Sequence, residues 1–230
     1  YNWEKLRDTN YNWWVERVRS NLSTCDIIRI DHFRGFEAYW AVPYGDDTAI
    51  NGQWEPGPGI DLFNAIKSQL GELPIIAEDL GLMTQGVIDL REATGFPGMK
   101  ILGFAFDSGE ENDYLPHTYT KNCVVYTGTH DNDTLIGWFQ KAKEEDRHFA
   151  RDYLNSRSDD EIHWDAIRGA WSSVANMAIS PVQDFLGLGS EARINTPGVA
   201  AGNWQWRLKH GVLTDELADR IAKLTKVYSR

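Results

Sequence analysis

The spacing of hydrophobic residues along the chain predicts helices that alternate with short strands. Up to about residue 22, apolar residues recur every three or four positions and are interrupted near Asp8–Asn10, which predicts two amphipathic helices. Residues 26–31 (DIIRID) form a β-branched run that ends in polar groups. This run predicts a buried parallel strand with Asp31 at its C-terminal end. Residues 74–78 (PIIAE) predict a second strand, with Glu78 at its end.

The rest of the chain continues this alternation. Further strands are expected at Met99–Phe106, Cys123–Tyr126 and Ala178–Val182, the last weakened by its proline. Helices are expected at Ile60–Leu70, between Leu82 and Gly95, at Leu135–Leu154 and at Trp164–Ala175. The Gly- and Pro-rich stretch Pro43–Gly59 predicts a long loop, and long loops in compact domains are usually functional.

Short apolar strands that alternate with helices predict an α/β fold with a parallel sheet. A complete eight-stranded barrel typically needs about 250 residues. A doubly wound sheet and a partial barrel therefore both remain open from the pattern alone. The first residue is Tyr1 and the first segment already has a helical pattern, so we interpret the chain as part of a longer protein.

Composition and charge exclude several classes of partner. Hydrophobic residues make up 42% of the chain and charged residues 25%, which is typical of a globular protein. The net charge of −11 argues against nucleic acid or an anionic membrane as the main partner. Cys25 and Cys123 are the only cysteines, and their spacing suggests neither a disulfide framework nor a zinc site. Isolated thiols of this kind are typical of buried, reduced cysteines in the cytosol.

Three predicted strand ends carry an acid: Asp31, Glu78 and Asp131. In a barrel, the loops at the C-terminal ends of the strands build the active site, so these acids would converge there. Cleavage of a glycosidic bond with retention needs two carboxyl groups about 5–5.5 Å apart, one protonated and one ionised. Arg29 precedes Asp31 by two residues and so shares its face of the strand, where it would hold Asp31 ionised. The acidic neighbour Asp79 would favour the protonated form of Glu78.

Four motifs resemble those of the 4-α-glucanotransferases, also called amylomaltases or disproportionating enzymes. The matching segments are residues 28–35 (IRIDHFRG), 76–81 (IAEDLG), 128–134 (GTHDNDT), and 193–198 (RINTPG) followed by 202–208 (GNWQWRL). The order and spacing of these motifs also match, and the resemblance extends from Tyr1 to about Leu208.

The resemblance implies a (β/α)8 (TIM) barrel of the α-amylase superfamily, of which residues 1–230 would be the C-terminal part, with strands four to eight. It implies a retaining mechanism in which Asp31 is the nucleophile, Glu78 the acid/base and Asp131 the transition-state stabiliser. It further implies that Arg29 and His130 contact the donor sugar or the nucleophile, and more loosely that His32 and Asn195 bind substrate.

The resemblance also implies the partners: an α-1,4-glucan donor and a glucose or maltooligosaccharide acceptor. No cofactor, metal, nucleic-acid partner or membrane is expected. We expect a cytoplasmic location, with the plastid stroma as the alternative. Most of the ten Trp residues are expected in the core. Trp40 and Trp54 follow the first strand and are the candidates for stacking on glucose rings.

Each local feature also has a simpler interpretation. Arg29 and Asp31 could form a structural ion pair, and Glu78-Asp79 could lie at the N-terminus of a helix. Residues 130–133 (HDND) alternate oxygen ligands, but they lack the Gly and the distant Glu of a calcium loop. A Ser-His-Asp hydrolase is not supported, because the chain has no Gly-x-Ser-x-Gly motif.

Two functional alternatives remain. One is an α-glucan hydrolase of the same superfamily, in which water replaces the acceptor. The other is a piece that only binds glucan or is inert. The segment 195–198 (NTPG) favours the transferase.

Overall fold

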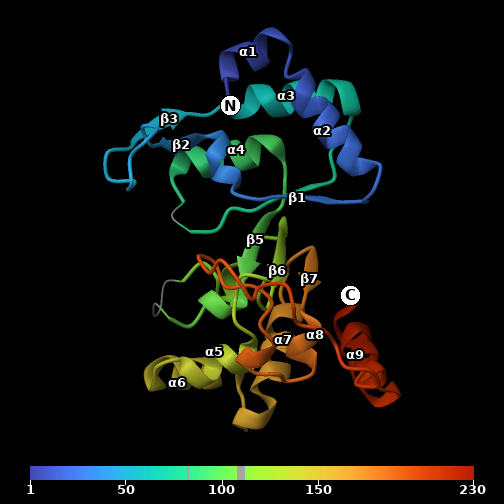
Figure 1. Cartoon of the computed structure of the whole chain (residues 1–230). Helices are drawn as coiled ribbons and strands as arrows, with labels where there is room; N and C mark the ends of the chain where they lie inside the picture. Colours follow the sequence, from blue (N-terminus) through green and yellow to red (C-terminus); the bar gives the residue numbers. More distant parts are fainter. Residues whose placement is uncertain (82, 108–111) are drawn as a thin grey trace. The chain divides into compact units, whose positions relative to one another are not determined.

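The computed structural model describes residues 1–81, 83–107 and 112–230. It has the predicted mixture of helices and parallel strands (Figure 1). The chain divides into two compact units, Tyr1–Met99 and Lys100–Arg230, and each unit is described by itself.

The first unit contains two parallel strands and the helices that pack beside them. Aromatic and aliphatic side chains form its core. The helices are α1 (Trp3–Asp8), α2 (Asn12–Leu22), the 3-10 helix η1 (Phe33–Phe36), α3 (Gly59–Leu70) and α4 (Gln85–Thr94). Strand β1 (Ile28–Ile30) pairs with β4 (Ile75–Ala77), with Arg29 opposite Ile76. Side chains of α2, η1 and α3 pack together in the core, among them Val15, Phe33, Leu62 and Phe63. The paired strands deliver their C-terminal ends side by side, as predicted.

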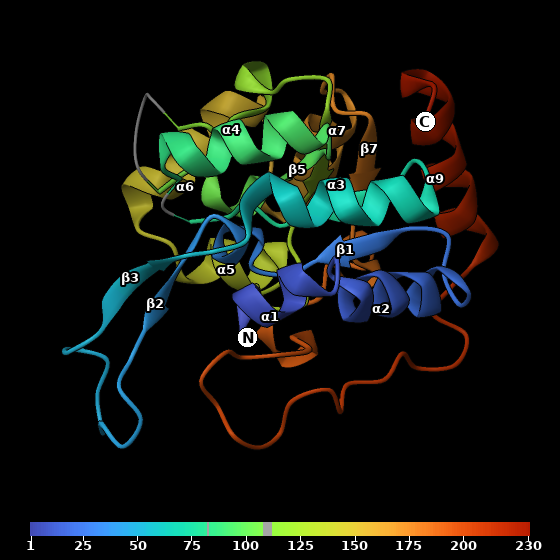
Figure 2. The ribbon, with the colours of Figure 1, turned by 90° about the horizontal axis from the view of Figure 1, so that it is seen from above.

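A hairpin occupies part of the stretch predicted to be a long loop. Strand β2 (Ala38–Ala41) pairs antiparallel with β3 (Gln53–Pro56), so that Trp40 lies opposite Trp54. The hairpin extends away from α3 in both views (Figures 1 and 2). The expected loop from Pro43 to Gly59 is therefore wrong for β3 and for the first residue of α3.

The second unit is built on a three-stranded sheet in the order β5-β6-β7. These strands are β5 (Gly98–Ile101), which begins at the end of the first unit, β6 (Cys123–Tyr126) and β7 (Met177–Ile179). β6 and β7 are parallel. The helices are α5 (Leu135–Lys141), α6 (Glu144–Leu154), α7 (Ile162–Trp171), α8 (Val182–Phe185) and α9 (Asp215–Tyr228). The short 3-10 helices are η2 (Leu102–Phe104), η3 (Pro116–Thr118), η4 (Asp159–Glu161) and η5 (Ser190–Ala192). Its core contains side chains of α5 and α7 together with Cys123 and Val125 of β6.

Several boundaries differ from prediction for local reasons. Ala142 and Lys143 are extended, with ψ of 152° and 154°, and divide the predicted helix Leu135–Leu154 into α5 and α6. The third strand ends at Ile101, because the chain turns there into η2. The last strand ends before Pro181, which has no N–H to donate to a ladder. The two thiols also differ: Cys123 is buried as expected, whereas Cys25 is exposed. Among the described helices, none has the length and apolar character needed to cross a membrane.

Candidate active site

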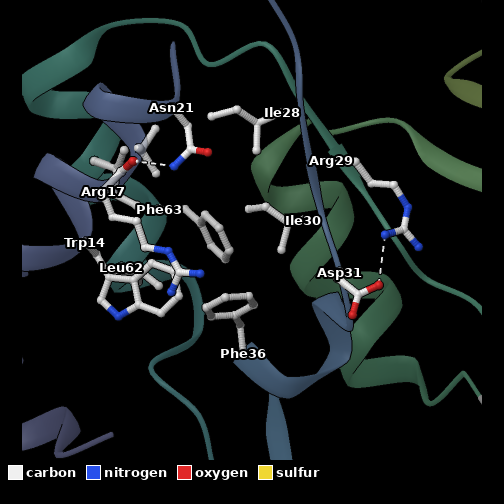
Figure 3. Close-up of a pocket in the computed structure, with 12 residues that line it drawn as sticks. Trp14, Arg17, Asn21, Ile28, Arg29, Ile30, Asp31, Phe36, Leu62 and Phe63 are labelled. Atoms are coloured by element: carbon white, nitrogen blue, oxygen red, sulfur yellow. Dashed lines mark hydrogen bonds and ion pairs between the residues drawn. The ribbon is translucent and has the colours of Figure 1, made fainter. Parts of the chain in front are cut away.

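Arg29 and Asp31 form an ion pair at the end of β1. Nη1 of Arg29 lies 2.8 Å from Oδ1 of Asp31. Ile28 and Ile30 point to the opposite side of the strand, Ile28 toward Asn21 and Ile30 toward Phe63 and Phe36 (Figure 3). This alternation follows from the extended backbone and confirms that Arg29 and Asp31 share a face. The Asp31 side chain is 76% exposed, and ion pairs with so exposed a partner contribute little to stability, so orientation of the carboxylate is the main effect of Arg29.

Glu78 directly follows β4 and is held by the turn that follows Asp31. Its Oε2 accepts a hydrogen bond of 2.6 Å from the backbone N–H of His32, and Oε1 accepts one of 3.0 Å from the N–H of Leu80. The backbone of Glu78 also donates to Ile30. His32 has φ of 50°, in the left-handed region, which turns the chain toward Glu78. The structure therefore brings Asp31, His32 and Glu78 together at one end of the paired strands.

The acidic neighbour Asp79 has a structural role. Its Oδ2 lies 2.6 Å from Nη1 of Arg91 in α4, and its Oδ1 accepts the N–H of Met99 at 2.7 Å. A Cβ atom at Gly98 would overlap the Asp79 carboxylate. The charge of Asp79 is thus paired with Arg91 and is not left free beside Glu78. The helix-cap alternative for residues 78–79 is wrong, because α4 begins at Gln85, after Thr84.

Two hollows adjoin Asp31 in the first unit. Their volumes are about 240 and 330 Å³, and both are lined by Trp14, Arg17, Asp31 and Phe36. The guanidinium carbon of Arg17 lies 4.9 Å from the centre of the Trp14 ring. Small-ligand sites are usually about 300–1,000 Å³ and lined by aromatic side chains with a few polar groups. The larger hollow therefore has the size and lining for a small polar ring such as a sugar.

Trp40 and Trp54 lie on the hairpin, with ring centres 5.4 Å apart. They are 43% and 54% exposed. The Trp40 indole N–H donates to the carbonyl of Ala49, and the ring lies so close to Gly52 that a Cβ atom there would overlap it. The guanidinium carbon of Arg34 lies 4.5 Å from the centre of the Trp54 ring. Both exposed indoles are therefore fixed in orientation, which lowers the entropic cost of stacking a ligand on them.

In the second unit, Asp131 follows β6 and contacts two of the predicted binding residues. Nδ2 of Asn195 donates to its Oδ1 at 2.5 Å, and Nε2 of His130 lies 3.3 Å from its Oδ2. The rings of His130 and Trp204 lie with their centres 5.2 Å apart. The alternation of Trp204 and Trp206 in the sequence suggested that one of the two faces the cleft and the other the core, and the motif 202–208 also marked Trp204.

The oxygens of residues 132 and 133 are used inside the protein. Oδ1 of Asn132 accepts the N–H and the hydroxyl of Thr129, both at 2.8 Å. Asp133 Oδ2 lies 2.7 Å from Nζ of Lys141 and accepts the Ser190 hydroxyl at 2.7 Å. Burial acts to raise the pKa of Asp133, but the hydrogen bonds from Lys141 and Ser190 outweigh it and hold the pKa below its usual value. In the described parts of the chain, no three His, Cys, Asp or Glu side chains cluster in a way that could hold a metal ion.

A buried carboxyl group, Asp184, supports the same loop and was not predicted. Its Oδ2 accepts the Thr127 hydroxyl at 2.6 Å, and its Oδ1 accepts the N–H of Leu135 at 2.9 Å. Burial raises the pKa of Asp184 above its usual value, although these two hydrogen bonds oppose the shift. The bonds attach both ends of the segment 127–135 to α8, so the loop with His130 and Asp131 has fixed ends.

These features define an α/β protein that presents carboxylates just after its parallel strands, with exposed aromatic side chains beside them. The chain belongs to the 4-alpha-glucanotransferase family, whose sequence profile matches residues 1–214.

Individual relatives agree with this assignment. The chain is 54% identical over 231 residues to a 4-alpha-glucanotransferase from Clostridium butyricum. The matched region covers 100% of this chain and 47% of that protein. It is 46% identical over 233 residues to a chloroplastic/amyloplastic 4-alpha-glucanotransferase from Arabidopsis thaliana, covering 100% of this chain and 40% of that protein. The structure is similar to that of the amylomaltase from Streptococcus agalactiae in complex with acarbose, with a TM-score of 0.97 and 38% identity. That match covers 100% of this chain and 47% of the other. The chain thus spans about half the length of the relatives it matches.

Proposed function

We propose that residues 1–230 form the C-terminal part of the catalytic (β/α)8 barrel of a retaining 4-α-glucanotransferase. In this proposal they supply strands four to eight, and the rest of the barrel lies in a part of the protein outside this sequence. The family match, the share of the relatives' length and the parallel pairing of β1 with β4 and of β6 with β7 support it.

The proposed reaction has two displacements. Glu78 protonates the glycosidic oxygen of the donor while Asp31 attacks the anomeric carbon, so that the leaving glucan departs and a β-glycosyl ester forms on Asp31. The 4-OH of an acceptor glucan then attacks this carbon, Glu78 takes up the hydroxyl proton, and Asp31 is released. Asp131 stabilises the positive charge that develops on the sugar in both steps.

The observation that carries this proposal is the placement of Asp31 and Glu78. Arg29 holds the Asp31 carboxylate at 2.8 Å, and the next residue after Asp31 donates its N–H to Glu78 at 2.6 Å. A retaining double displacement uses a pair of carboxyl groups, one as nucleophile and one as acid/base, and the adjoining ends of β1 and β4 supply such a pair.

The binding roles of the remaining residues belong to the same proposal. Arg29, His32 and His130 contact the donor sugar near the reacting bond, and Asn195 orients Asp131. Trp40 and Trp54 stack on glucose rings of the chain. The partners are an α-1,4-glucan donor and a glucose or maltooligosaccharide acceptor; the related amylomaltase structure is a complex with acarbose. For location we propose the cytoplasm, or the plastid stroma if the source is a plant.

Disproportionation of maltotriose by the full-length protein tests this function. Asp31→Ala and Glu78→Gln should each abolish formation of maltooligosaccharides longer than the substrate. Glu72→Gln is the matched control, since the Glu72 side chain is 88% exposed and pairs with Lys67 at the surface. Wild-type rates in either active-site variant would refute the assignment.

The same assay separates the alternatives. Release of glucose and shorter products alone would indicate a hydrolase, in which water replaces the acceptor. We expect the 230-residue piece by itself to be inactive. Turnover by the isolated piece equal to that of the full-length protein would contradict the proposed division of the barrel.

A further inference from the structure

The loop that carries His130 and Asp131 is irregular between its two ends, which Asp184 of α8 holds. Residues 127–134 lie between β6 and α5, and the Asn195 amide that contacts the Asp131 carboxylate also comes from an irregular segment. Both groups must nevertheless be held within a fraction of an ångström, because a displacement of about 1 Å near a reacting centre can cost about 100-fold in rate.

Arg193 connects the two segments. Its Nη2 donates to the backbone carbonyl of Asp131 at 2.5 Å, and its Nε donates to the backbone carbonyl of Asn195 at 2.8 Å. One planar guanidinium thus fixes the main chain of the residue that offers the carboxylate and of the residue that orients it. The Arg193 side chain is half-buried, which shields these bonds from water.

Two further hydrogen bonds hold the segment that carries Asn195. Asn203 accepts the N–H of Thr196 at 2.9 Å, and the N–H of Trp204 donates to the carbonyl of Ile194 at 2.7 Å. These bonds fold the chain back so that the Trp204 ring lies beside that of His130. Arg193 therefore lies between the segment that carries Asn195 and the loop that carries Asp131.

The group to which Arg193 donates its hydrogen bond explains why a charged arginine is compatible with a position beside Asp131. Arg193 binds the carbonyl of Asp131 and not its carboxylate, so the negative charge of Asp131 keeps no direct ion pair with it. That charge must stay available to stabilise a positive sugar. A lysine has a point charge without the fixed fork of donors and could not hold both carbonyls in the same geometry.

We propose that Arg193 is a positioning residue for the transfer reaction, acting through Asp131 and Asn195. This inference rests on the proposed function, in which Asp131 stabilises the transition state. A residue that acts only through Asp131 should lower kcat and leave KM for the donor nearly unchanged.

The test uses the full-length protein and an activated donor, α-maltosyl fluoride, so that slow variants remain measurable. Arg193→Ala should lower kcat about 100-fold, with KM changed less than threefold, and added guanidinium ion should restore part of the activity. Arg193→Lys should lie between Arg193→Ala and the wild type. Arg157→Met, at an exposed position on the same unit, is the control and should leave both constants unchanged.

A double variant separates this inference from the proposed function. In an Asp131→Ala background, Arg193→Ala should cause little further loss of kcat; an equal further loss would show that Arg193 does not act through Asp131. Full activity of Asp131→Ala alone would overturn the proposed function instead. If Arg193→Ala does not fold even with guanidinium, Arg193→Lys decides: a wild-type kcat, or a rise in KM alone, overturns the positioning role.

Discussion

The backbone N–H of His32 donates a 2.6 Å hydrogen bond to the carboxylate of Glu78, so the residue after the proposed nucleophile holds the proposed acid/base. The bond depends on the backbone of His32, which has φ of 50°. The two proposed catalytic groups are thereby linked through a single turn of main chain. A change that distorts this turn should disturb both groups, whereas a change confined to the side chain should not.

Replacing His32 by two different residues separates these effects. His32→Asn keeps a residue that tolerates the left-handed region, so kcat should stay within about threefold while KM rises through the lost ring. His32→Val introduces a β-branched side chain, whose strain of about 1–2 kcal/mol would displace the turn and lower kcat as well. Steady-state kinetics with maltotriose measures both constants. Equal kcat values in the two variants would contradict a role for this turn.

The Arg29–Asp31 pair makes a second prediction. Arg29→Met leaves the Asp31 carboxylate without the group that orients it, and kcat should fall about 100-fold, the loss that a displacement of about 1 Å near a reacting centre can cause. The matched control is Arg19→Met, because Arg19 pairs with Glu16 at the surface in a bond of 3.2 Å. Both variants should keep the thermal stability of the wild type, measured by circular dichroism. A loss of stability in Arg29→Met without loss of kcat would mean that the pair is structural.

The exposed indoles of the hairpin are expected to affect the binding of long glucans. Trp54→Ala should raise KM for long maltooligosaccharides about two- to twelvefold, the equivalent of about 0.5–1.5 kcal/mol for an aromatic contact. Gly52→Ala should act in the same direction, because its Cβ atom would displace the Trp40 indole. Val227→Ala is the control, since Val227 is 59% exposed and lies on α9 of the second unit. If Trp54→Ala leaves KM for amylose unchanged, the hairpin does not contribute to substrate binding.

Asp133 predicts a pH dependence of stability. Its pKa in the folded state lies below the usual value of 3.8, since hydrogen bonds from Lys141 and Ser190 outweigh the effect of burial. The carboxylate therefore stabilises the fold above about pH 5, and this contribution is lost as the pH falls through the lowered pKa. Asp133→Asn should lower Tm at pH 7, and its difference from the wild type should shrink below pH 4. Glu145→Gln, whose carboxylate is 75% exposed, should show little effect at either pH; a difference for Asp133→Asn that stays constant with pH would contradict the assignment.

The sequence predicted those parts of the fold that depend on local pattern. The strands with Ile28 and Ile75 were correct because each is a short apolar run that ends in an acid. The alternation of side chains also predicted the Arg29–Asp31 pair. The family resemblance marked Asn195 only as a loosely assigned binding residue, and its contact with Asp131 was not predicted, since no local pattern links residues so far apart.

The sequence missed features that arise only when distant segments meet. The pairing of Trp40 with Trp54 was hidden, because the intervening Gly- and Pro-rich stretch has the composition of a loop. The ion pair of Asp79 with Arg91 neutralises a charge that the local sequence presents as free. The bonds from Arg193 to two carbonyls depend on backbone groups, which every residue has and which spacing therefore does not reveal.

Trapping of the glycosyl-enzyme tests the central claim most directly. The full-length protein would be treated with a 5-fluoro-α-maltosyl fluoride, digested, and mapped by mass spectrometry. We predict a single modified peptide with the sugar attached to Asp31, and no label in Asp31→Ala. A sugar attached to another carboxylate, or none under conditions in which the donor inactivates the enzyme, would contradict the account.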